Sequence, residues 1–236
     1  MPPSFQIFVI YHKVLYAICY EKLPPELFQY LTFVAVNPAI EKIYPPSNFS
    51  LIKEWELPLY NPRYQQKGYN ENSVLFHLYL NGILKKYDYV GFCQYDMIFE
   101  DFTPLLAALK PSTYIGTEIR GNTHWNFCFG GTELKTLDIM EKTFGLTFER
   151  ELGRDRIYPL FNTYIVPSAD FQKIVGWALQ VDSLLVSWLT ERPLDTIPYL
   201  IGSVFERVFA MGVGELLQRS ETVWNIEHPG ELKQHS

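Results

Sequence analysis

The stretch YDYVGFCQYDMIFED, residues 87–101, changes from a continuous apolar run to a group of carboxylates. Its first half is typical of a strand that is covered on both faces of a sheet. Its second half carries Asp96, followed by Glu100 and Asp101. Two interpretations are open for this acidic end: a turn on the protein surface, or a carboxylate that holds a metal ion at the rim of a parallel sheet.

Several other segments have the length and periodicity of strands or helices. Strands are predicted over residues 5–12, 31–38, 112–119, 124–131 and 156–167. Helices are predicted over residues 70–86, 103–109, 132–145, 169–190 and 196–211, with Asn72 or Ser73, Thr103 and Ser168 as caps of three of them. Residues 41–70 have little periodicity and predict a long irregular loop. Alternating strands and helices indicate an α/β fold, with a mainly parallel central sheet flanked by helices.

The composition limits the classes to which the protein can belong. An apolar content of 47% over 236 residues excludes a disordered chain. The net charge of −6 and the lack of a basic run argue against nucleic-acid binding. The three cysteines, an odd number without a CxxC pair, are typical of reduced, buried thiols. We see no signal peptide and no run of about 18 apolar residues, and therefore expect a cytoplasmic protein without a membrane span.

Three of the predicted strands have polar ends. These residues are Tyr11, His12 and Lys13 at the end of the first strand, Asn37 at the end of the second, and Gln94, Tyr95 and Asp96 at the end of the strand that begins at residue 87. Because the carboxyl ends of parallel strands meet at one edge of a sheet, these side chains are expected to face a common crevice. This coincidence is the main indication of a ligand site.

The run YNENSVLFHLYLNGILKKYDYVGFCQYDMIF, residues 69–99, resembles the GT-A glycosyltransferases, which use nucleotide sugars and have a Rossmann-like domain. In that family a helix leads into a strand that ends in an Asp-x-Asp metal motif. The sequence of this run most resembles those of small capsule-type and large-virus glycosyltransferases. The order of elements matches over about residues 5–131, and residues 197–212 are similar to the family's C-terminal helix. The resemblance implies a single domain over 1–236, with a nucleotide-sugar-binding half at 1–131 and an acceptor-side half at 132–236.

The match to the metal motif is incomplete, because Gln94 replaces its first aspartate. The resemblance implies that Asp96, the last residue of the motif, binds Mn²⁺ or Mg²⁺, with His228 as a candidate second ligand. A single carboxylate is compatible with these ions, since phosphate oxygens and water complete their coordination. A metal-free enzyme is the alternative, and for His228 the alternative is a solvent-exposed position in the C-terminal tail.

Further residues are candidates for binding the donor. They are Tyr11, His12, Lys13, Asn37, Gln94 and Tyr95 for the nucleoside and its surroundings, Arg63 and Lys67 for the diphosphate, and Asn70 and Asn72 for sugar or phosphate oxygens. Each has a structural alternative: a solvated strand end, a loop charge or a helix cap.

The segment GNTHWNFCFGG, residues 121–131, is a candidate shelf for a sugar. Trp125 offers a flat apolar face to a pyranose ring, and His124 and Asn126 offer partners for its hydroxyl groups. The alternative is a strand in the core.

Glu206 is the candidate group for activating an acceptor hydroxyl, because a general base of this kind is a carboxylate or a histidine. Gly202 and Ala210, each about one helical turn away, are small and leave space beside the carboxylate. The alternative is a surface ion pair with Arg207 or Arg192.

We therefore expect a glycosyltransferase that moves a sugar from a nucleotide-diphosphate sugar, above all a UDP-sugar, to a hydroxyl of a glycan or glycoprotein. Asp96 with its metal would stabilise the departing diphosphate, and Glu206 would activate the acceptor or position the sugar. Two other hypotheses are open: a non-catalytic nucleotide- or carbohydrate-binding domain of the same fold, which Gln94 favours, and a metal-dependent phosphohydrolase.

Overall fold

The computed structural model describes residues 3–17, 20–66, 69–95, 101–109, 113–116, 142, 162–190, 200–217 and 222–225. The strands are β1 (Phe5–Tyr11), β2 (Leu31–Ala35), β3 (Ser50–Lys53), β4 (Tyr89–Gln94), β5 (Thr113–Gly116), β6 (Tyr164–Pro167) and β7 (Thr222–Asn225). The helices are α1 (Pro62–Gln66), α2 (Asn72–Leu80), α3 (Thr103–Ala108), α6 (Ser168–Thr190) and α7 (Leu200–Leu217).

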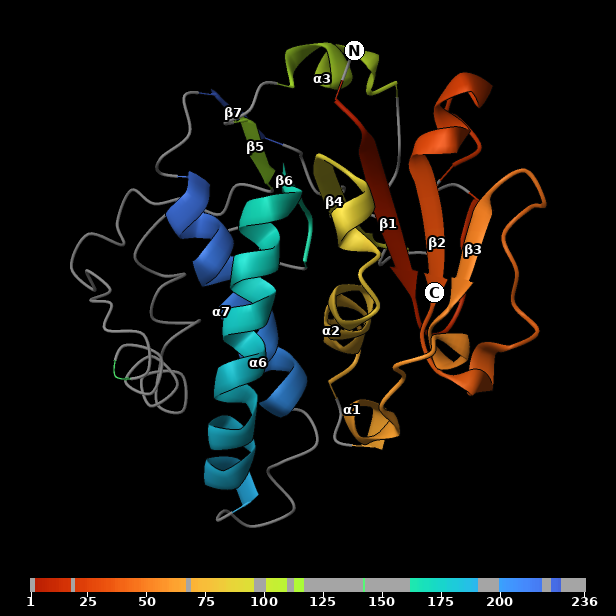
Figure 1. Ribbon diagram of the computed structural model, residues 1–236. Helices are drawn as coiled ribbons and strands as arrows, with labels where there is room; N and C mark the ends of the chain where they lie inside the picture. The colour runs from red at the N-terminus through yellow and green to blue at the C-terminus, as the bar shows by residue number, and fades with distance from the viewer. Residues whose placement is uncertain are drawn as a thin grey trace.

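The strands form one sheet in the order β3-β2-β1-β4-β6-β5-β7 (Figure 1). Strands β2 and β4 both run parallel to β1, and β3 runs parallel to β2. Strand β6 is antiparallel to both β4 and β5, and β7 pairs in parallel with β5. The prediction of an α/β fold with a mainly parallel sheet is therefore confirmed, and segments from both halves of the chain build that sheet.

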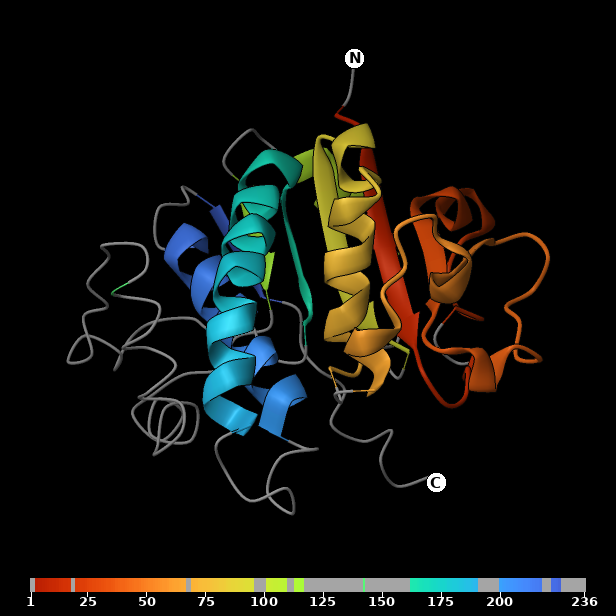
Figure 2. The same cartoon turned by 60° about the horizontal axis from the view of Figure 1, so that its bottom comes forward.

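The continuous apolar run of β1 is explained by burial of both faces of the sheet. Phe8 and Ile10 lie in a core that also contains residues of α2, α6 and α7. Ile7 and Val9 lie in a second core, which is closed by Leu27 and other residues outside those helices. Figure 2 shows α2 and α6 side by side over one face of the sheet. A half-exposed sheet would instead show alternating polar residues along the strand.

Gly91 in β4 is a position where the sheet leaves no room for a side chain. A Cβ atom there would lie 2.9 Å from Cγ1 of Ile165 and 3.1 Å from Cγ1 of Ile7. We expect Gly91→Ala to lower the free energy of unfolding by about 1–3 kcal/mol, because two branched core side chains must move. Urea denaturation measures this loss.

Gly176→Ala in α6 is the matched control for Gly91→Ala. Its new methyl group meets Tyr79, whose hydroxyl oxygen at 3.0 Å is the nearest atom. Alanine is also favoured over glycine within a helix by about 1 kcal/mol. Equal losses of stability in the two variants would contradict the packing account of Gly91.

Several predictions of local structure are wrong. Residues 41–70 are not one irregular loop, because they contain β3 and α1. Neither Asn72 nor Ser73 caps α2, whose N-cap is Glu71 without a side-chain hydrogen bond. Thr103 does not cap α3 either; its N–H donates to Oδ1 of Asp101 at 2.8 Å. In each helix the residue expected to be the cap has become the first helical residue.

Some predicted elements lie outside the described residues, namely the strand at 124–131 and the helix at 132–145 apart from Lys142. In the part of the chain that the structure describes, none of the helices has both the length and the apolar character needed to cross a bilayer.

Candidate active site

The carboxyl edge of the sheet, formed by the ends of β1 and β4, is the place where the strand order reverses. Strands β2 and β3 extend from one side of β1, and β4 lies on its other side. Because both neighbours of β1 are parallel to it, all these strands end at the same edge. In open α/β sheets, ligands bind in the crevice beyond such a switch point. The predicted meeting of the strand ends is therefore confirmed for β1, β2 and β4.

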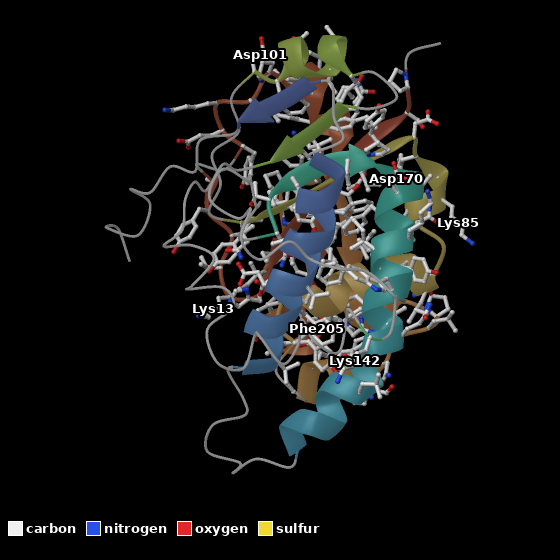
Figure 3. The ribbon with its side chains drawn as sticks, turned by 90° about the vertical axis from the view of Figure 1, so that its left-hand side faces the viewer. Lys13, Lys85, Asp101, Lys142, Asp170 and Phe205 are labelled. Atoms are coloured by element: carbon white, nitrogen blue, oxygen red, sulfur yellow. The ribbon has the colours of Figure 1, made fainter. Side chains whose placement is uncertain are left out.

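Three aromatic side chains meet beyond β1 and β4, and we refer to His12, Tyr16 and Tyr95 as the aromatic group. The ring of Tyr95 stacks on Tyr16 at a centroid distance of 5.9 Å and meets the edge of His12 at 5.3 Å. The backbone N–H of Tyr95 donates to the carbonyl of Ile10 at 3.1 Å, which fixes Tyr95 beside β1. All three side chains are partly exposed. Lys13, which follows His12 in the sequence, is exposed and is labelled in Figure 3.

Tyr11 and Asn37, also predicted at these strand ends, have local structural partners. Tyr11 is fully buried, and its hydroxyl donates to the carbonyl of Ile43 at 2.9 Å. Burial, with a smaller contribution from Tyr44, raises the pKa of Tyr11 to about 12, so this hydroxyl stays protonated. Asn37 adopts a left-handed backbone conformation with φ of 67°, and its Oδ1 accepts the N–H of Ala39 at 2.7 Å.

On the other face of the same edge, Gln94 contacts a carboxylate from the start of α2. Its Nε2 donates to Oε1 of Glu71 at 3.2 Å. A carboxylate thus lies beside the position where the metal motif lacks its first aspartate. Glu71 was not predicted as a site residue, although it lies in the run YNEN at residues 69–72.

Asn72 is a buried connector between three segments. Its Nδ2 donates to the carbonyls of Tyr69 and Gly202, both at 3.0 Å. Its Oδ1 accepts from Nδ2 of Asn162, also at 3.0 Å. The side chain therefore joins α2 to α7 and to Asn162, two residues before β6. Asn70, by contrast, is exposed, and its carbonyl accepts the hydroxyl of Ser73 at 2.9 Å.

Glu206 lies on α7, one turn after Gly202, and is partly exposed. It is close to the fully buried Tyr164 of β6. Burial raises the pKa of Tyr164 well above its usual value, and the negative charge of Glu206 adds to this effect. The preceding turn of α7, on the same helix face as Glu206, is tied to Asn72 through the carbonyl of Gly202. Phe205, its neighbour, is labelled in Figure 3.

Arg63, a predicted ligand of the diphosphate, is paired within the protein. Its guanidinium forms an ion pair with Asp182 of α6 and lies over the ring of Tyr64 at 5.1 Å. The hydroxyl of Tyr69 donates to the other oxygen of the same carboxylate. The remaining predicted site residues lie outside the described residues: Lys67, Asp96, His124, Trp125, Asn126 and His228.

Within the described ranges, no three or more His, Cys, Asp or Glu side chains form a group that could hold a metal. The carboxylate of Glu71 and the amide oxygen of Gln94 are nevertheless hard oxygen donors of the kind that Mg²⁺ and Mn²⁺ prefer. Asp96 follows Gln94 by two residues in the sequence. The chemistry of this donor set fits a divalent cation.

No protein-family model matches the chain, and no curated protein matches it in sequence. Among solved structures, the chain is similar to the bifunctional glycosyltransferase WbbM in its apo form, with a TM-score of 0.63 and 14% sequence identity. The match covers 95% of this chain and 45% of WbbM, so the chain spans less than half of that protein. Mouse xyloside xylosyltransferase 1, apo form, has a TM-score of 0.41 and 10% identity over 94% of this chain and 84% of its own, which is too low to support a shared fold. The similarity to WbbM shows that the chain has a Rossmann-like fold of the same kind.

Proposed function

We propose that this protein transfers a sugar from a nucleotide-diphosphate sugar, with UDP as the preferred nucleotide, to a hydroxyl of a glycan or glycoprotein. The observation that carries the proposal is the carboxyl edge itself. The aromatic group lies on one face of this edge, and Gln94 with Glu71, which we call the polar group, lies on the other face. The edge is the switch point of a fold that resembles a glycosyltransferase. A ligand that has an aromatic base at one end and charged or hydroxylated groups at the other end suits the aromatic group and the polar group together.

The aromatic group is the proposed contact of the nucleobase. Stacking on an aromatic side chain is favourable for any base and excludes water from both faces. Tyr95 and Tyr16 present such faces, and His12 adds ring nitrogens that hydrogen-bond. Lys13 is exposed next to them and supplies a positive charge.

The polar group is the proposed neighbour of the diphosphate. A diphosphate beside Glu71 would bring like charges together, and a divalent cation between them removes that repulsion. From the sequence we propose Asp96 and His228 as the residues that bind this cation, Mn²⁺ or Mg²⁺. The metal would supply positive charge against the leaving diphosphate. Glu206 is the proposed group that accepts the proton of the acceptor hydroxyl or positions the sugar.

Tyr95→Ala tests the nucleobase contact. In a thermal-shift titration, UDP-sugar with Mn²⁺ is expected to stabilise the wild-type protein more than either component alone, because ligands that bind only the folded state raise its stability. Loss of the Tyr95 ring is expected to weaken UDP binding about tenfold, since stacking on an aromatic ring contributes about 1–3 kcal/mol.

Tyr30→Ala is the control for Tyr95→Ala. Tyr30 packs on Phe5 and Phe102 beside the start of β1, at the edge of the sheet opposite the aromatic group. The Tyr30→Ala substitution also removes a tyrosine ring but leaves the candidate site intact, so the affinity for UDP should not change. Equal UDP affinities in the Tyr95→Ala and wild-type proteins would place the nucleobase elsewhere.

A non-catalytic binding domain is the second candidate, and Gln94 favours it because it takes the place of a metal-binding aspartate. Both candidates predict binding of nucleotide sugar. Only a transferase releases UDP in the presence of an acceptor, which a coupled assay for free UDP detects. Binding without UDP release across a panel of glycan acceptors would favour the second candidate.

A further inference from the structure

Among the residues that the structure describes, two buried polar atoms close to the carboxyl edge lack a hydrogen-bond partner. They are Oδ1 of Asn162 and the hydroxyl of Tyr164, whose residues are 1% and 0% exposed. Buried polar groups in folded proteins are almost always hydrogen-bonded, so each exception needs an explanation, and a bound ligand or water is one. Both atoms belong to the short segment that enters β6.

The pairing of β6 with β4 places this segment at the candidate site. Tyr164 lies opposite Phe92 in the antiparallel register. Asn162 precedes Tyr164 by two residues and lies outside the paired region, whereas Gln94 follows Phe92 by two residues. A side-chain contact brings Asn162 to the site: its Nδ2 donates to Oδ1 of Asn72, which follows Glu71, the partner of Gln94.

Helix α7 completes the arrangement. Asn72, the partner of Asn162, also donates to the carbonyl of Gly202, and Glu206 lies one turn further along this helix. The charge of Glu206 acts on the Tyr164 hydroxyl. Residues 162 and 164 therefore lie along the same side of α7 as residues 202 and 206.

The chemistry of these groups suits a hydroxylated ligand. The amide oxygen of Asn162 accepts a hydrogen bond, the buried phenol of Tyr164 remains protonated and donates one, and the carboxylate of Glu206 accepts another. Each hydroxyl group of a sugar can both donate and accept a hydrogen bond, so neighbouring hydroxyls can pair with this set of acceptors and donors. A phosphate only accepts hydrogen bonds and cannot pair with the acceptors of the set.

We propose that Asn162 and Tyr164, beside Glu206, form a subsite that binds hydroxyl groups of the transferred sugar. The identity of the ligand as a sugar rests on the proposed function. The subsite is a specificity determinant: it distinguishes UDP-sugar from UDP, whereas the aromatic group binds both.

Tyr164→Phe tests this subsite, because it removes one oxygen and keeps the ring. Titration calorimetry with Mn²⁺ compares UDP, UDP-glucose, UDP-galactose and UDP-N-acetylglucosamine. The variant is expected to bind UDP as the wild type does, and the preferred UDP-sugar about fivefold more weakly, as the loss of one hydrogen bond implies. Its resistance to urea should equal or exceed that of the wild type, since a buried hydroxyl without a partner has been removed.

Tyr89→Phe is the matched control. Tyr89 is also a buried tyrosine of this sheet, but it lies at the first position of β4, opposite Pro167 and away from the carboxyl edge. It should leave the preference for UDP-sugar over UDP unchanged. If Tyr164→Phe also keeps the full preference, or if the wild type has none, the subsite is overturned and the hydroxyl of Tyr164 serves a buried water only.

A second probe separates this inference from the proposed function. Should the wild type bind neither UDP nor any UDP-sugar, the proposed function fails. Saturation-transfer NMR with methyl glucoside, methyl galactoside and methyl N-acetylglucosaminide then tests the subsite directly. Signals that are present with the wild type and lost with Tyr164→Phe support the subsite, whereas their absence with the wild type overturns it.

Discussion

An Asp96→Ala variant is expected to transfer sugar about 10²–10³-fold more slowly than the wild type, the loss typical when one positioned electrostatic group is removed from an active site. Asp96 follows the carboxyl end of β4 at the switch point, where negative charge on a departing diphosphate would have to be stabilised. The rate of UDP release with donor, acceptor and Mn²⁺ measures the effect. Stability should change little, since the variant truncates a single side chain beyond the end of the strand.

Asp101→Ala is the control for Asp96→Ala. Its carboxylate accepts the N–H of Thr103 at the start of α3. Figure 3 shows Asp101 at the top of the view and Lys13, which follows β1, well below it. This control removes the same charge but should leave transfer unchanged. Full transfer activity in Asp96→Ala would show that this carboxylate takes no part in the reaction.

Glu54→Ala is expected to lower the free energy of unfolding by about 3–5 kcal/mol, because it leaves buried polar partners without their acceptor. Glu54 and His77 are both 0% exposed, and Nδ1 of His77 lies 2.6 Å from Oε1 of Glu54. The other carboxylate oxygen accepts from Gln65 at 2.6 Å. Nε2 of His77 in turn accepts the N–H of Asn61 at 2.8 Å, so Nδ1 carries the proton that is donated to Glu54.

Glu56→Ala is the control for Glu54→Ala. Glu56 lies two residues away and pairs with Lys53 at 3.0 Å, but its side chain is 59% exposed. Exposed pairs of this kind contribute about 0–1 kcal/mol. The midpoint of urea denaturation should therefore fall strongly for Glu54→Ala and hardly for Glu56→Ala. Similar midpoints would show that the buried network does not hold this segment in place.

The central strands were predictable from the sequence because burial on both faces leaves mostly apolar residues in them. Residues 5–12, 31–38 and 87–93 were predicted as strands, and they contain β1, β2 and nearly all of β4. Helix α6 begins within one residue of its predicted start, although Ser168 does not act as expected: its hydroxyl donates to the carbonyl of Leu84 at 2.5 Å.

Strand β3 was not predictable, because its formation depends on contacts with residues far away in the sequence. Ser50 is exposed, the other three residues of β3 are partly exposed, and the strand lies among prolines and asparagines, so it has no strong periodicity. What fixes the following segment is the buried contact of Glu54 with His77, which joins it to α2. A glutamate in a polar stretch gives no sign that it is fully buried.

Part of the candidate site was predictable and part was not. His12, Gln94 and Tyr95 were predicted because polar residues at the end of a buried strand stand out. Glu71, Tyr16, Asn162 and Tyr164 were missed, since their positions depend on register and on side-chain bonds between segments. The left-handed backbone of Asn162, with φ of 46°, likewise has no signal beyond the preference of asparagine for that conformation.

The central claim is that a nucleotide sugar binds at the carboxyl edge of the sheet, between β1 and β4. A crystal structure of the protein with UDP and Mn²⁺ tests it most directly. The account predicts the uracil ring against Tyr95 and the diphosphate beyond the end of β4, next to Gln94. A nucleotide bound at any other place, or a protein that takes up no UDP at millimolar concentration, would contradict it.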